Sequence, residues 1–228
     1  MERPYQTIEG EGQMKKKLLS GFLCLCMVAS VLSATASAAN SPFTDVGANA
    51  YYAAPVAWAV EEGITTGKTA TEFRPDEVCT RAQIITFLWR AAGSPESKIT
   101  TKLFKDITEE DYCYEAAMWA CEKSILTVIG QKFDPNTPCT RADAVSYIWR
   151  YAGCPYGYSI RGFYDVSRKS VAAYPIRWAV GYGVTNGVTA YLFEPESTCT
   201  RGQIVTYLYR YFVEPIPAEE RTNIVYVE

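Results

Sequence analysis

The sequence contains no histidine. A Ser–His or Cys–His catalytic pair is therefore impossible, and so is any metal site with a histidine ligand. The sequence also lacks an excess of positive charge, because its net charge is −3. The composition therefore gives no indication of a nucleic-acid partner. The carboxylates show no distinctive pairing of the kind a glycosidase uses, which disfavours an enzyme. These absences favour a binding or structural protein without a cofactor.

Long hydrophobic runs are scarce as well, and the most prominent one lies near the N-terminus. Residues 18–32 are mostly apolar, follow three lysines at 15–17, and precede the small residues at 36–38. This order is typical of a secretion signal, and the run is too short for a membrane span. We expect the true start at Met14, because the residues before it would need purine-rich codons like those of a ribosome-binding site. We therefore predict a leader over residues 1–39 and no membrane contact after its cleavage.

Six cysteines remain after this leader: Cys79, Cys113, Cys121, Cys139, Cys154 and Cys199. An even number in an exported chain is compatible with disulfides. Three of the six, however, occupy one equivalent position in a repeat, where a reduced cysteine serves as a small buried hydrophobe. No two have the spacing of a zinc finger. We favour reduced thiols over disulfides and predict no metal site.

The most informative feature present is a short stretch that occurs three times. Cys-Thr-Arg stands at 79–81, 139–141 and 199–201, so the copies lie 60 residues apart, and each opens an apolar run. A fixed period of this size is typical of a repeat protein. One repeat of about 55 residues makes a poor core by itself, so we expect the three to pack together.

Each copy predicts the start of a helix. Thr80 is a suitable N-cap, and Gln83 three residues later completes a capping box. Cys79 precedes the cap and can pack on Ile84 as a hydrophobic staple. The third copy repeats the box with Gln203, whereas Asp143 of the second copy is shorter and should reach back less well.

The capping box does not explain the arginine. Arg81, Arg141 and Arg201 all fall at the first helical position, where a cation opposes the helix dipole. Each is therefore expected to face an anion, because its planar fork matches a carboxylate. Two sources stay open. One is a ligand, which we favour, and the other is an internal ion pair with Asp45, Asp106 or Asp165.

The segments before the three copies also repeat. Each has Phe-x-Asp, a short helical stretch (54–62 in the first), a loop, and a Phe-x-Pro turn. The pattern predicts a mainly helical chain of three helix–loop–helix repeats. The predicted parts are repeat 1 at 40–95, repeat 2 at 101–155, repeat 3 at 160–212, and a tail at 213–228.

On these residues the chain resembles three tandem S-layer homology (SLH) domains. The resemblance rests on Phe-x-Asp-Val, Gly-Ile or Gly-Val, a glycine loop, Phe-x-Pro and Thr-Arg, all in register. It implies a pseudo-threefold helical prism. It also implies non-covalent binding to secondary cell-wall polysaccharide, often carrying pyruvate ketals, in grooves between the repeats.

The resemblance, together with the arginine argument, gives a set of candidate polysaccharide-binding residues. They are Arg81, Arg201, Arg141, Gly67, Gly187, Asp45, Asp165, Gln83, Gln203, Trp58 and Trp178. The tryptophans could stack on sugar rings, although a place in the core is favoured for them. Repeat 2 has Ser124 and Val128 at the glycine positions and a shorter loop, so we expect its groove, with Arg141, to matter less.

The implied location is the cell wall or surface of a Gram-positive type of bacterium. A self-assembling surface-layer protein is the alternative function. A protein partner or self-association also stays open, because the sequence shows no cargo domain.

Overall fold

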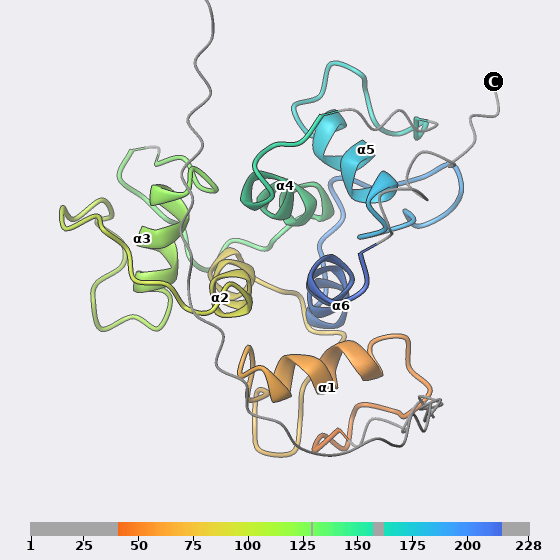
Figure 1. The fold of residues 1–228 in the computed structure, drawn as a ribbon, viewed down its shortest axis with the longest axis horizontal. Coiled ribbons are helices and arrows are strands. Elements are labelled where there is room, and N and C mark those ends of the chain that lie inside the picture. The colour runs from red at the N-terminus through yellow and green to blue at the C-terminus, as the bar shows by residue number, and fades with distance from the viewer. Residues whose placement is uncertain (1–40, 129, 157–161, 216–228) are drawn as a thin grey trace, which may run out of the picture. The chain divides into compact units, whose positions relative to one another are not determined.

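The computed structural model describes residues 41–128, 130–156 and 162–215, and within them the chain forms six helices. Short and longer helices alternate along the sequence (Figure 1). They are α1 (Ala53–Glu61), α2 (Arg81–Ala91), α3 (Tyr114–Glu122), α4 (Arg141–Tyr151), α5 (Ala173–Gly181) and α6 (Arg201–Phe212). The prediction of a mainly helical chain is confirmed, with α1 one residue earlier than expected. The predicted leader, with Met14, and the tail beyond residue 215 lie outside the described residues.

The longer helices begin where the repeated stretch predicts. The Thr80 hydroxyl accepts a hydrogen bond from the Gln83 N–H at 3.3 Å, and the Thr80 N–H donates to the Gln83 side chain at 3.0 Å. All three capping boxes are complete. The Thr140 N–H donates to the Asp143 carboxylate at 3.3 Å, whereas the Thr200 N–H of repeat 3 donates to the Gln203 side-chain oxygen at 3.1 Å. The shorter side chain thus gives the longer bond, as expected.

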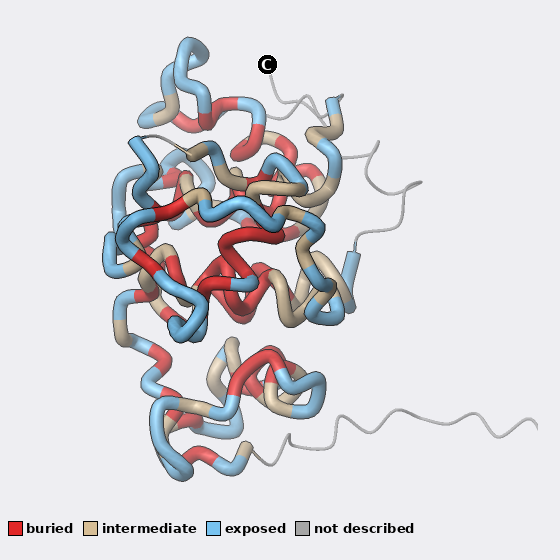
Figure 2. Tube along the Cα trace, turned by 90° about the vertical axis from the view of Figure 1, so that its left-hand side faces the viewer, coloured by how far each residue is buried: buried red, intermediate tan, exposed pale blue. Residues whose placement is uncertain are grey.

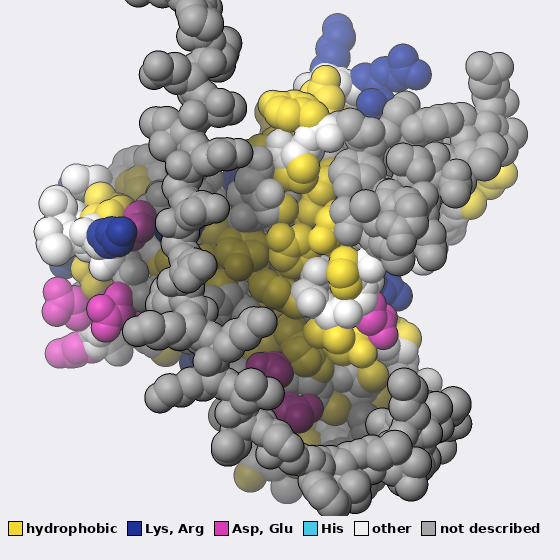
Figure 3. All heavy atoms as spheres, in the orientation of Figure 1, with side chains coloured by type: hydrophobic (Ala, Val, Ile, Leu, Met, Phe, Trp, Pro, Cys, Tyr) yellow, Lys and Arg dark blue, Asp and Glu magenta, His cyan; other side chains and the backbone are white. Residues whose placement is uncertain are grey.

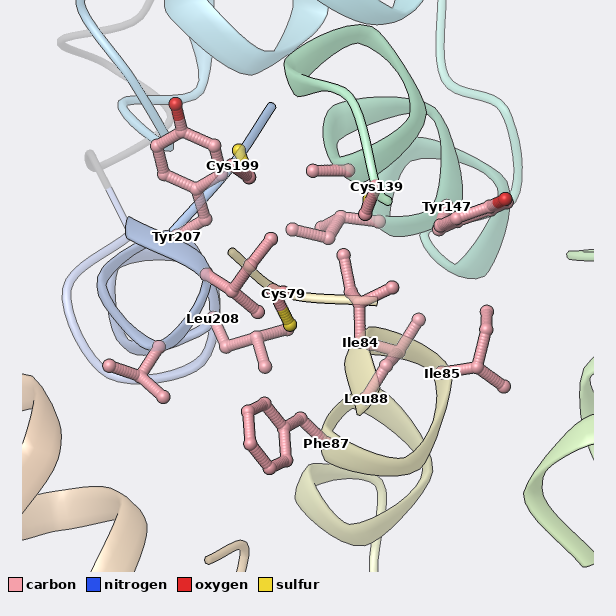
Figure 4. Packing of buried hydrophobic residues seen from close by; sticks show 14 of the residues in the cluster. Cys79, Ile84, Ile85, Phe87, Leu88, Cys139, Tyr147, Cys199, Tyr207 and Leu208 are labelled. Atoms are coloured by element: carbon pink, nitrogen blue, oxygen red, sulfur yellow. The ribbon is translucent and has the colours of Figure 1, made fainter. Parts of the chain in front are cut away.

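The residue before each cap belongs to a closed ring of backbone hydrogen bonds, which we term the cysteine ring. The Cys139 N–H donates to the Cys79 carbonyl, the Cys199 N–H to the Cys139 carbonyl, and the Cys79 N–H to the Cys199 carbonyl, each at 2.8 Å. The three side chains are 0–1% exposed and lie in the centre of the core (Figure 4). All six cysteines of the described chain are unpaired thiols, as favoured above.

Helix contacts link each repeat to both of the others. The helices α2, α4 and α6 contact one another, whereas α3 packs on α2, α5 on α4, and α1 on α6 (Figure 1). The first helix of a repeat therefore packs on the second helix of the preceding repeat, and repeat 1 takes repeat 3 as its predecessor. Buried and exposed stretches alternate along the described chain (Figure 2). A regular prism stays a prediction, but these contacts decide which side chains meet between repeats.

Candidate functional site

The motif aspartates hold the Phe-x-Pro turns. The Asp45 carboxylate accepts hydrogen bonds from the Phe73 N–H at 2.9 Å and the Arg74 N–H at 2.6 Å. Asp106 and Asp165 make the same pair of bonds in repeats 2 and 3. Arg74 has a φ of 59°, a left-handed conformation that these bonds stabilise.

None of the three motif arginines forms an ion pair with Asp45, Asp106 or Asp165 in the described part of the chain, so these three aspartates are wrong as ion-pair partners. Arg81 instead lies 3.9 Å from the Asp134 carboxylate. The aspartates are occupied with backbone N–H groups, and the arginines face a different set of acceptors.

Those acceptors are backbone carbonyls of the next repeat. Arg81 donates from Nη1 to the Phe133 carbonyl at 2.8 Å, and Arg201 donates from Nε to the Phe73 carbonyl at 2.9 Å. Arg141 makes the equivalent bond to Phe193 at 2.8 Å. The guanidinium carbons of Arg141 and Arg201 also lie 4.9 and 4.7 Å from the centres of the phenylalanine rings whose carbonyls they contact. Each arginine thus makes a hydrogen bond to a backbone carbonyl across a repeat boundary.

This geometry corrects the assignment of arginines to loops. We paired Arg141 with the glycine-poor loop of repeat 2, but the hydrogen bonds place Arg81 beside that loop and Arg141 beside repeat 3. Arg201 faces the loop of repeat 1. The reason is the closed order of packing, in which every repeat reaches into its successor.

A cavity of about 200 Å³, which we name the first groove, lies where all three repeats meet. It is lined by Thr65, Thr66, Gly67, Lys68, Gln83, Thr86, Phe87, Arg90, Tyr112 and Arg201. Arg201 is 3% exposed, and its Nη2 has no hydrogen-bond partner among the described residues. Burial lowers the pKa of Arg201. An anion in this groove would meet a partly unpaired guanidinium.

Gly67 shapes the first groove through packing. Its φ is +87°, and a Cβ at this position would collide with the ring of Phe43. Gly187 has a φ of +82° and the same relation to Phe163. Both glycines therefore let the loop lie directly on the motif phenylalanine.

A second groove, of about 540 Å³, surrounds Arg81. Its lining is Arg81, Leu126, Thr127, Lys132, Asp134, Tyr147 and Arg150. The Arg81 side chain is 29% exposed, so it is more accessible than Arg141 or Arg201. Three cations against one carboxylate make this groove suitable for an anionic ligand.

Arg141 is bound differently. Its Nη1 donates to the Tyr207 hydroxyl at 2.7 Å, its Nε is held by the Phe193 carbonyl, and its Nη2 has no partner in the described chain. The residue is 4% exposed. Arg141 is therefore the motif arginine with the most protein contacts.

The two candidate tryptophans lie outside the two grooves. Trp178 is 1% exposed, packed beside Tyr182 and Tyr211, so its assignment as a sugar contact is wrong. Trp58 is half-buried against Tyr209 and Phe212 and lines a separate cavity with Glu62 and Arg90. Gln83 lines the first groove while closing its capping box, whereas Gln203 is placed only by its box.

Several lining residues were absent from the prediction, and their spacing could have revealed some of them. Phe87, Tyr147 and Tyr207 stand 60 residues apart on the second helices, and each contacts or lines the surroundings of a motif arginine. Lys68 and Lys132, in contrast, have no such recurrence. They reach the grooves through loops whose course the motif does not determine.

Other kinds of site find no support in the described ranges. No cluster of three or more potential ligands there could hold a metal ion, and none of the helices has the length and apolar character needed to cross a bilayer. On the face shown in Figure 3, the lysine and arginine side chains of the described residues are scattered, with hydrophobic side chains between them.

Comparison with known proteins agrees with the repeat structure. The profile of the S-layer homology domain matches three segments, 42–85, 103–145 and 162–205. A cell surface protein of Thermoanaerobacter kivui is 33% identical over 153 residues, which is 63% of this chain and 20% of that protein. An S-layer protein of Bacillus thuringiensis subsp. finitimus is 26% identical over 197 residues, 85% of this chain and 24% of that protein. The chain thus spans about a quarter or less of these relatives. Each matched segment contains the first helix of one repeat and the start of its second helix. Because the three segments cover more than half of its length, the chain belongs to the S-layer homology domain family.

Proposed function

We propose that this chain is a cell-surface module that attaches non-covalently to the bacterial cell wall. Its ligand would be a secondary wall polysaccharide that carries carboxylates, such as pyruvate ketals, bound in the grooves between repeats. Membership of the S-layer homology family and similarity to proteins named as surface and S-layer proteins support the location. The single observation that carries the ligand class is the Arg201 guanidinium in the first groove, with its unpaired Nη2.

The physical reason is the free energy of a buried cation. An isolated charge out of water is unfavourable, and a hydrogen-bonded anion relieves that penalty. Arg201 Nε donates a hydrogen bond to the Phe73 carbonyl, and this bond orients the guanidinium. The two terminal nitrogens of Arg201 then stay available for a ligand carboxylate. Such a charge-assisted bond contributes about 1.5–3 kcal/mol.

The rest of the first groove suits a sugar. Thr66, Lys68, Gln83 and Tyr112 supply hydroxyl, amine and amide groups around Arg201. Tyr112 is 61% exposed and presents an aromatic face beside polar groups, a combination that suits a sugar ring. The second groove, with Arg81, Lys132 and Arg150, would take a second anionic unit.

This is a proposal of binding without catalysis. We place the chain in the cell wall or on the cell surface of a Gram-positive type of bacterium. We expect no nucleic-acid partner, and no membrane partner after removal of the leader. A surface-layer function is the alternative, because two relatives are named S-layer proteins and this chain matches about 24% of their length.

Co-sedimentation tests the proposal. The chain from residue 40 onward should pellet with purified Gram-positive sacculi and stay in solution when hydrofluoric acid has stripped the polysaccharide from them. Equal binding to the stripped peptidoglycan would refute the polysaccharide ligand. A lattice former would instead sediment as large assemblies without any wall material, which sedimentation velocity detects.

A further inference from the structure

The three motif arginines have unequal freedom to bind a ligand, and a single side-chain position accounts for much of the difference. This position is Phe87 on α2, Tyr147 on α4 and Tyr207 on α6, and the three side chains point outward from the centre in different directions (Figure 4). Each lies beside the arginine that reaches in from the preceding repeat.

Arg141 and Arg201 form a matched pair for comparison. Both are nearly buried, both donate from Nε to a phenylalanine carbonyl, and both have an Nη2 without a partner among the described residues. Their guanidinium carbons lie 6.0 Å from the Tyr207 ring and 5.4 Å from the Phe87 ring. They differ at Nη1, because Arg141 Nη1 donates to the Tyr207 hydroxyl, whereas the Phe87 ring beside Arg201 has no hydroxyl that could accept such a bond.

We propose that Tyr207 caps Arg141 from within, so that this arginine is closed to an anionic ligand, whereas Phe87 leaves Arg201 open and makes the first groove a principal binding site. The inference rests on the proposed function and specifies which of the three inter-repeat positions performs it. The ligand class is a hexose that bears a carboxylate.

The chemistry of the cap supports this assignment. The 2.7 Å bond from Arg141 Nη1 uses the Tyr207 oxygen as acceptor. Burial raises the pKa of Tyr207 to about 12, so the hydroxyl stays protonated at neutral pH. A ligand carboxylate would have to displace this hydroxyl and break its short bond to the buried guanidinium, which is unfavourable. No such exchange is needed at Arg201.

Calorimetric titration with a defined probe tests the inference. The probe is a methyl hexoside with a 4,6-pyruvate ketal, and the same hexoside without the ketal is the neutral control. Tyr207→Phe removes only the capping oxygen and should add one binding site for the probe. Phe87→Tyr introduces a cap beside Arg201 and should weaken binding in the first groove about tenfold or more. Tyr174→Phe, at an exposed tyrosine on α5 that lines neither groove, is the control for loss of a hydroxyl.

The outcomes separate this inference from the proposed function. If the wild-type chain binds neither the probe nor intact sacculi, the proposed function fails, and the inference fails with it. If the wild type binds the probe but Tyr207→Phe adds no site, or Phe87→Tyr leaves the affinity in the first groove unchanged, only the capping inference is overturned. Should Tyr207→Phe not fold, Phe87→Tyr decides the question alone, with its melting temperature as the check on folding.

Discussion

Replacement of Arg201 by alanine should destabilise the fold much more than replacement of Arg81, although both begin a second helix. The two side chains differ in burial, since Arg201 is 3% exposed and the Arg81 side chain is 29% exposed. The bond from Arg201 to the Phe73 carbonyl contributes about 1.5–3 kcal/mol. The contacts with the Phe73 and Phe87 rings contribute about 1 kcal/mol more. The unpaired Nη2 offsets about 1 kcal/mol of this sum.

The net loss for Arg201→Ala is then about 1.5–3 kcal/mol, which corresponds to a fall in melting temperature of about 3–12 °C for a chain of this size. Arg81→Ala should cost about 1 kcal/mol or less, because its 2.8 Å bond to the Phe133 carbonyl is partly solvated. Thermal unfolding followed by circular dichroism measures both. Arg168→Ala, at an exposed position, controls for the change in net charge.

Equal falls in melting temperature for Arg201→Ala and Arg81→Ala would refute this reasoning, as would a loss at Arg201 no larger than at Arg168. Equal falls would mean that the burial of Arg201 adds nothing to a carbonyl contact that Arg81 also makes. A loss no larger than at Arg168 would mean that this contact stabilises the repeat boundary no better than a surface charge does. Arg201 would then be held in place for the ligand alone.

Three further predictions follow from individual side chains. Gly67→Ala should lower the melting temperature more than Gly63→Ala in the same scan, because both have positive φ but only the Gly67 Cβ would meet a ring, whereas Gly63 faces open space. A thiol reagent should label the half-buried Cys154 before Cys79, which is fully buried and whose pKa burial raises to about 12; rapid modification of Cys79 in native buffer, seen by mass spectrometry, would contradict the core position. Desolvation raises the pKa of Asp106, but hydrogen bonds from the Phe133 and Asp134 N–H groups outweigh it, so the pKa lies below its ordinary 3.8. The stability that Asp106 adds relative to Asp106→Asn should therefore be complete above that value and vanish as the pH falls through the lowered pKa in thermal melts.

The sequence predicted the parts of the fold that local chemistry determines. Thr80 and Gln83 lie three residues apart, and a capping box needs no information from elsewhere in the chain. The 60-residue period likewise follows from the printed sequence. The N-termini of α2, α4 and α6 and the class of fold were therefore predictable.

The partners of the arginines were not predictable, because they depend on which repeat follows which in space. Arg201 and Phe73 lie 128 residues apart, and no local pattern links them. The tryptophans show the same limit. Trp58 and Trp178 are equivalent in sequence, yet Trp178 is enclosed by Tyr182 and Tyr211, whereas Trp58 stays half-exposed beside Tyr209 and Phe212.

The cysteine ring has a consequence for how the molecule comes apart. In an open array of repeats, a terminal unit can unfold and leave the others intact, since it has only one neighbour. Here α1 packs on α6, and the Cys79 N–H donates to the Cys199 carbonyl, so every repeat has two neighbours and none is terminal. Loss of any one repeat breaks two boundaries at once. The three repeats should therefore unfold together in one cooperative transition. During folding, repeat 1 has to meet repeat 3 to close the ring, and these two repeats are far apart in the sequence. Because contacts of long sequence separation form slowly, we expect this step to be late and slow.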